Sequence, residues 1–135
     1  MENKIDFNEI LKDYALGLTK KHIKDKLAEY YFSTYNVKAR NVKEELNSIL
    51  QDYGCYVDNN CSHLYNIGNN NAWSIKMYET NEVVATLWII EDIYGGVVHV
   101  RIEDLNGIFK VKLQFNSNYV VIKENGEKYT RRFRD

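Results

Sequence analysis

Two cysteines and a histidine lie close together near the middle of the chain, and these residue types can bind zinc. Cys55, Cys61 and His63 have the spacing C-x5-C-x-H, and a distant His22 or Asp58 could supply a fourth ligand. This spacing is not a recognised zinc pattern. We therefore expect ordinary reduced thiols and no bound metal. A hairpin disulfide is a further alternative, which a reducing compartment disfavours.

A second polar group alternates along a short segment near residue 100. His99, Arg101 and Glu103 are each separated by one residue, so in a strand they share one face. Neighbours at this spacing lie about 6.5 to 7 Å apart, which is typical of a solvated face more often than of a site. The chain also lacks a glycine-rich phosphate loop and the sequences G-x-S-x-G and H-E-x-x-H. We expect no enzymatic activity, no catalytic residue and no cofactor.

Basic and acidic residues are unevenly distributed, although the formal net charge of the 135 residues is only −1. The segment 19–43 contains seven basic and two acidic residues, whereas the segment 78–105 contains six acidic residues and one basic residue. Such a protein can present one surface to phosphates and another to a basic protein. Two ordinary solvated faces would give the same pattern.

Capping residues and apolar stripes predict two helices before residue 32. Asp6 is a good N-cap with Glu9 at capping-box spacing, and Gly17 would end this first helix. Thr19 can cap a second helix. The expected buried stripes are Phe7, Ile10, Leu11, Tyr14 and Ala15 in the first helix, and Ile23, Leu27, Tyr30 and Tyr31 in the second.

A third helix is predicted to begin between residues 37 and 40 and to end before Gly54. Its first turns carry Arg40, Asn41 and Lys43 away from the apolar stripe. Arg and Asn can make bidentate contacts with guanine and adenine, and the first turns of a recognition helix reach base edges. The alternative is a plain amphipathic helix with an ordinary polar face.

The order of these elements resembles a winged helix-turn-helix. The resemblance covers residues 19–67, where two helices precede the segments CYVD and HLYNI, which could pair around NNCS as a wing. The connector FSTYNVKA is longer than the tightest turn of such modules, and the supposed wing contains no Lys or Arg. The resemblance implies duplex DNA as the partner, bound through Lys20, Lys21, Lys24, Arg40, Asn41 and Lys43.

From Trp73 onward the apolar period changes from helical to extended. The segment 83–90 is apolar on both faces, as expected for a strand in the middle of a covered sheet. Asn125-Gly126 is a strong hairpin signal. In the two strands before that hairpin, the residues expected to face inward are Val98, Val100, Ile102, Phe109, Val111, Leu113 and Phe115.

These patterns predict an α+β protein, with three N-terminal helices in a winged-helix-like arrangement followed by an antiparallel sheet of five or six strands. The segment GNNNA at 68–72 is the best candidate boundary. It would divide the chain into a helical region at 1–70 and a sheet region at 71–135. A single continuous domain, with the helices packed directly on the sheet, is the alternative.

The sequence has no run of about 18 apolar residues, and its first ten residues lack the apolar core of a signal peptide, so we expect a cytoplasmic protein that does not enter a membrane. The expected function is non-enzymatic nucleic-acid binding of a phage or mobile-element type. One alternative is a phage-encoded, anti-CRISPR-like inhibitor of a bacterial defence system, which would bind a nucleic-acid-binding host protein through an acidic and aromatic surface. Another is a homodimer formed through the segment 83–90.

Overall fold

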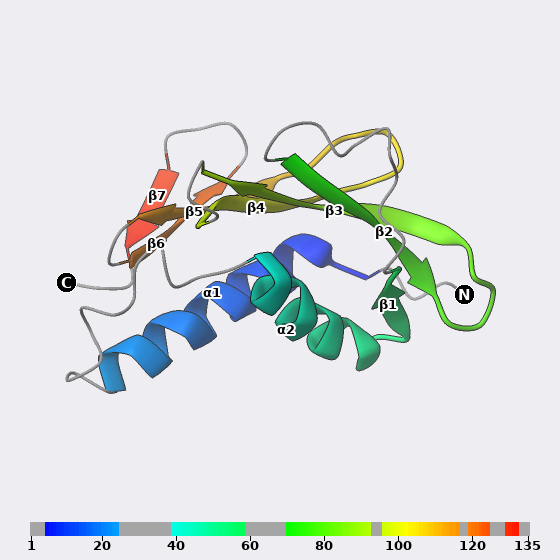
Figure 1. Cartoon of the computed structure of the whole chain (residues 1–135), viewed down its shortest axis with the longest axis horizontal. Coiled ribbons are helices and arrows are strands. Elements are labelled where there is room, and N and C mark those ends of the chain that lie inside the picture. The colour runs from blue at the N-terminus through cyan, green and yellow to red at the C-terminus, as the bar shows by residue number, and fades with distance from the viewer. Residues whose placement is uncertain are drawn as a thin grey trace.

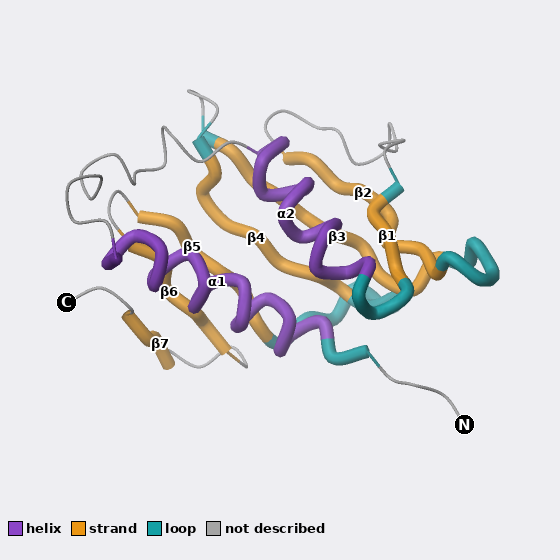
Figure 2. Tube along the Cα trace, turned by 90° about the horizontal axis from the view of Figure 1, so that it is seen from below, coloured by secondary structure: helices purple, strands orange, loops and turns teal. Residues whose placement is uncertain are grey.

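Two helices cover one face of an antiparallel β-sheet (Figures 1 and 2). The computed structural model describes residues 5–24, 39–58, 70–92, 96–116, 119–124 and 129–132. In this part of the chain the helices are α1 (Phe7–Lys24) and α2 (Ala39–Gln51). The α+β character of the prediction agrees with this architecture, but the three-helix arrangement is wrong.

α1 is a single helix of 18 residues, where we predicted a break at Gly17 and a new start at Thr19. Its start is as predicted, because the Asp6 carboxylate accepts a hydrogen bond of 3.1 Å from the backbone N–H of Glu9. Gly17 does not adopt the left-handed conformation of a C-terminal glycine, which only Gly54 and Gly107 adopt among the described glycines. The helix continues because the stripe ahead of Gly17 is buried, and this burial outweighs the low helix propensity of one glycine.

α2 ends as predicted, with a tight turn before Gly54. The backbone N–H of Tyr53 donates to the carbonyl of Leu50 at 2.9 Å, and Gly54 follows with φ +80°. The buried residues of α2 are Ala39, Val42, Leu46 and Leu50. A hydrogen bond of 2.7 Å from the Tyr14 hydroxyl to Glu45 joins the two helices.

The sheet contains seven strands in the part of the chain described, each antiparallel to the next along the sequence. They are β1 (Cys55–Val57), β2 (Asn70–Met77), β3 (Val83–Glu91), β4 (Val97–Glu103), β5 (Val111–Asn116), β6 (Tyr119–Glu124) and β7 (Tyr129–Arg132). We predicted five or six strands. The additional strand is β1, which pairs with the end of β2 and not as part of a separate wing. The wing's second predicted strand, 63–67, lies outside the described residues.

One hydrophobic core lies between the helices and the inner face of the sheet. It includes side chains from both helices and from β1 to β6. In β3, for example, Ala85, Leu87 and Ile89 are fully buried, and the intervening Thr86 and Trp88 face the other way and are half-buried. β3 is flanked on both sides by other strands, and a homodimer formed through it stays a prediction.

Neither helix in the described part of the chain combines the length and the apolar character needed to cross a membrane.

Replacing Gly17 with Ala should stabilise the protein by about 0.5 to 1 kcal/mol, because alanine has the higher helix propensity. Gly17 is exposed, and a Cβ atom there would meet no heavy atom within 4 Å. Equilibrium urea unfolding measures the change. Gly54→Ala is the matched control, because its φ of +80° strains an alanine, and it should destabilise the protein by about 1 kcal/mol. Destabilisation by Gly17→Ala would show that the helix is not continuous at this residue.

Candidate functional site

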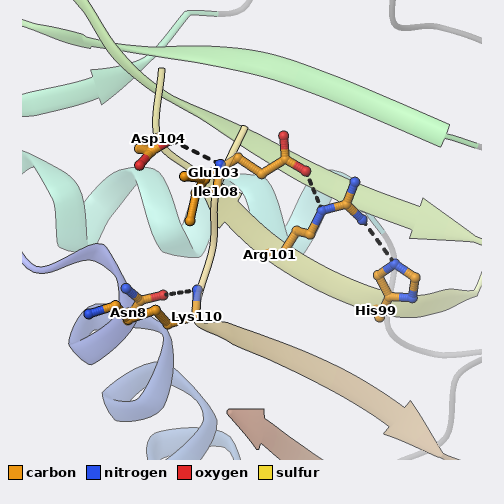
Figure 3. Close-up of polar contacts among 7 residues, drawn as sticks. All are labelled: Asn8, His99, Arg101, Glu103, Asp104, Ile108 and Lys110. Atoms are coloured by element: carbon orange, nitrogen blue, oxygen red, sulfur yellow. Dashed lines mark hydrogen bonds and ion pairs between the residues drawn. The ribbon is translucent and has the colours of Figure 1, made fainter. Parts of the chain in front are cut away.

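The outer face of the sheet, directed away from the helices, carries a connected group of polar side chains (Figure 3). Val100 and Ile102 of β4 point inward into the core, so the alternating residues His99, Arg101 and Glu103 point outward. All three are half-buried, although we expected an ordinary solvated face.

Arg101 is the centre of this group. Its Nε atom donates to the Glu103 carboxylate at 2.5 Å, and its Nη1 atom lies 3.3 Å from Nε2 of His99. The guanidinium also lies over two aromatic rings, 4.9 Å from the centroid of Trp88 and 5.1 Å from that of Phe109. Because the arginine side chain is long, it reaches both His99 and Glu103 across the spacing between alternate residues of the strand. The guanidinium is therefore held in one position.

Three cations stand directly opposite one another across three strands. The register places Lys112 of β5 opposite Arg101 and Lys123 of β6 opposite Lys112, all on the outer face. Within the described residues neither lysine forms an ion pair, while Arg101 is paired with Glu103. Like charges directly opposite each other destabilise a sheet. We call Arg101, Lys112 and Lys123 the cation row.

The cation row changes the protonation of His99. Burial, together with the positive charges of Lys112, Arg101 and Lys123, lowers the pKa of His99 to about 4 from its ordinary value of 6.5. The neutral ring then leaves Nε2 able to accept a hydrogen bond from Arg101. At neutral pH the row therefore gains no fourth positive charge from His99.

The loop between β4 and β5 borders the same group (Figure 3). The Asp104 carboxylate accepts hydrogen bonds from the backbone N–H groups of Asn106 at 2.8 Å and Ile108 at 2.9 Å, which fixes the turn. Asn8 of α1 accepts one of 3.3 Å from the backbone N–H of Lys110. We predicted that Phe109 faces the core, but it belongs to this loop and is 39% exposed, because β5 begins only at Val111.

The residues that we predicted for DNA binding lie in the helical layer. Arg40 and Asn41 are exposed at the start of α2, whereas Lys43 is half-buried with its ammonium 5.4 Å from the centroid of Trp73. The end of α1 that contains Lys20, Lys21 and Lys24 projects away from α2 in both views (Figures 1 and 2). The side chains of these three lysines are outside the described part.

The structure describes only part of the predicted cysteine and histidine cluster. Cys55 is a buried free thiol whose Sγ atom lies 3.4 Å from Sδ of Met77, and burial raises its pKa. Cys61, His63 and His22 fall outside the residues with described side chains. Among the described residues no three His, Cys, Asp or Glu side chains lie close enough to hold a metal ion.

Sequence reasoning missed the two lysines of the cation row. Alternation did place Lys112 outward, but the partner of an outward residue depends on strand register, which no local pattern revealed.

Comparisons of the chain with protein-family models, with curated proteins and with solved structures give no match.

His99→Gln should reduce the loss of stability between pH 7 and pH 5. The pKa of His99 is lowered by folding, so its contribution is constant above about pH 6.5 and falls as pH drops toward 4, because only the unfolded chain takes up the proton. Because the ring is half-exposed, we expect the free energy of unfolding to fall by about 1 kcal/mol less in the variant than in the wild type between pH 7 and pH 5. Urea unfolding at both pH values measures it. An equal loss in variant and wild type would contradict the lowered pKa.

Proposed function

We propose that the protein is a non-enzymatic nucleic-acid-binding protein whose phosphate-binding surface is the outer face of the sheet. The observation that carries this proposal is the cation row, in which Arg101, Lys112 and Lys123 stand opposite one another. An unliganded fold is destabilised by such a row, whereas a bound polyanion would stabilise it. Nucleic-acid backbones are polyanions with regularly spaced phosphates, so they fit a linear group of cations.

The position of Arg101 supports the same proposal. Its guanidinium is held by Glu103 and by two aromatic rings, so little conformational entropy remains to be lost when it contacts a phosphate. Lys112 and Lys123, which are half-buried, add positive charge on the same side. Glu103 is the single carboxylate whose contact with the row is observed among the described residues.

The helical surface that we first expected to bind DNA also has carboxylates among its cations. Arg40 and Glu44 are four residues apart on α2 and both are exposed, so a carboxylate accompanies the arginine. Asn41 has the exposed Glu45 at the same spacing. Contacts through Arg40, Asn41 and Lys43, and through Lys20, Lys21 and Lys24, remain predictions, and one experiment separates the two surfaces.

Lys112→Gln should weaken nucleic-acid binding several-fold and reduce the slope of log affinity against log salt by about 1, because one phosphate contact is lost. Arg40→Gln is the matched control on the helical layer and should change the affinity by less than about twofold. Fluorescence anisotropy of a labelled oligonucleotide, titrated at about 50 and about 200 mM salt, measures both.

Urea unfolding of the same Lys112→Gln protein should give a stability equal to or slightly above that of the wild type, because a like-charge pair is removed. Lost binding with retained stability excludes unfolding as the cause. The reverse ranking, with Arg40→Gln the weaker binder, would refute the sheet surface and favour the helices.

A second candidate function, inhibition of a nucleic-acid-binding host protein, is favoured by the opposite charge at one end of the sheet. There the turn after α2 meets the β2–β3 hairpin, and the backbone N–H of Tyr78 donates to the carbonyl of Gly54 at 3.0 Å. Tyr53 and Tyr78 are 48% and 54% exposed. We call this surface the tyrosine end; its exposed carboxylates are Asp52, Glu79 and Glu82.

The tyrosine end has the composition of a protein interface. Tyr56 packs against Tyr78 with ring centroids 4.7 Å apart, so the exposed ring of Tyr78 is held in place. Tyrosines are frequent at interface hot spots, and the exposed carboxylates of this surface would attract a basic partner. A protein that binds nucleic acid is basic at its binding channel, which makes it a suitable partner.

Under this second candidate, the double variant Tyr53→Ala/Tyr78→Ala should lose a host protein that the wild type captures from a nuclease-treated bacterial lysate. Truncating two hot-spot tyrosines should weaken the complex by at least about tenfold. The Lys112→Gln variant is the control and should retain the captured protein. Capture that disappears with nuclease, or that survives in the double tyrosine variant, would argue against this candidate.

A further inference from the structure

An apolar loop adjoins the cation row, and a cavity lies behind this loop on the side of the helices. Leu105, Ile108 and Phe109, in the loop between β4 and β5, are 68%, 60% and 39% exposed. Three exposed apolar side chains in one loop are unusual for a surface that only meets water. Behind the loop, near the start of α1, lies a cavity of about 420 Å³, and its lining includes Phe7, Ile102, Ile108 and Phe109. A cavity of this size is within the range of small-ligand sites.

We propose that the ligand of the outer face is a single-stranded nucleic acid, with its phosphates on the cation row and one base stacked on Phe109 at the cavity. This inference rests on the proposed nucleic-acid-binding function and identifies the form of the nucleic acid. Phe109 is the link between the two parts, because it lines the cavity and its ring centroid lies 5.1 Å from the guanidinium of Arg101. A phosphate bound by Arg101 thus brings the neighbouring base to the aromatic ring.

The shape of the sheet favours a single strand over a duplex. Bases of a duplex are read by elements that fit a groove, such as a helix or a two-stranded ribbon. The cation row lies inside a sheet that has seven strands in the described part of the chain. β4, β5 and β6 each have neighbours on both sides, so none of them can enter a groove alone. Single strands expose the faces of their bases, and aromatic side chains beside a positively charged surface are the usual way to bind them.

The cavity contributes polar groups beside its apolar wall. Asp6, Asn8, Asp104 and Lys110 also line it. Asn8 and Asp104 are fixed by backbone hydrogen bonds, Asn8 to the N–H groups of Lys110 and Val111 and Asp104 to the loop. The bonds of Asn8 tie α1 to the loop, and those of Asp104 fix the loop itself. A base that enters finds a preformed site and orders little of the protein.

The test compares three labelled ligands by fluorescence anisotropy. They are a thymine oligonucleotide of about 12 nucleotides, the duplex of this strand with the complementary adenine oligonucleotide, and heparin, which has negative charge but no bases. Phe109→Ala should weaken binding of the single strand by about tenfold or more, because one stacking contact is lost, and should leave heparin binding within about twofold. Leu105→Ala is the matched control. It removes an exposed apolar side chain from the same loop that does not line the cavity, and it should change neither.

The outcomes separate this inference from the function on which it rests. Wild type that binds none of the three ligands would overturn both. Wild type that binds all three equally, with Phe109→Ala no weaker than Leu105→Ala, would overturn the single-strand inference and leave phosphate binding intact. Phe109→Trp should retain the affinity for the single strand, which shows that loss in Phe109→Ala comes from stacking and not from misfolding.

Discussion

The alternation of side chains across the sheet is the constraint on which the rest of the molecule depends. In β3, in β5 and from Val100 onward in β4, every second residue is buried under the helices, as with Leu87, Val100 and Leu113. A slip of one residue in any of these strands would expose its apolar side chains and bury its polar ones. The core therefore fixes the strand register, and the register determines which outward residues lie opposite each other on neighbouring strands.

This fixed register explains how a repulsive arrangement can persist in a folded protein. Arg101, Lys112 and Lys123 cannot move apart without shifting the strands, and the shift would disrupt the burial beneath them. The core thus stabilises a surface that is unfavourable by itself. The ordinary compensation would be carboxylates between the cations, and among the described residues the row contacts one, Glu103, at its end. Uncompensated positive charge on a surface attracts anions.

Local signals in the sequence predicted the elements whose causes are local. The Asp6 cap, the end of α2 before Gly54 and the inward alternation of Val111, Leu113 and Phe115 are all present. The predicted break at Gly17 was wrong because burial of α1 on the sheet outweighs the low helix propensity of glycine. A local stretch of sequence does not reveal that burial. The cation row could not be predicted from the sequence for the same reason. His99, Arg101 and Glu103 could be seen as neighbours, whereas Lys112 and Lys123 become neighbours only through pairing between strands.

The order of the strands has a consequence for how the chain acquires its structure. Each strand of the described sheet pairs with the strand that precedes or follows it in the sequence, so the sheet is assembled from successive hairpins. Closing short loops costs little chain entropy, and topologies rich in such local contacts fold faster than sheets that need distant strands to meet. The docking of α1 differs, because its Asn8 contacts Lys110 about a hundred residues later. The contact between α1 and the β4–β5 loop therefore closes a much longer segment of chain than any pairing of neighbouring strands, and it has the larger loop-closure entropy cost.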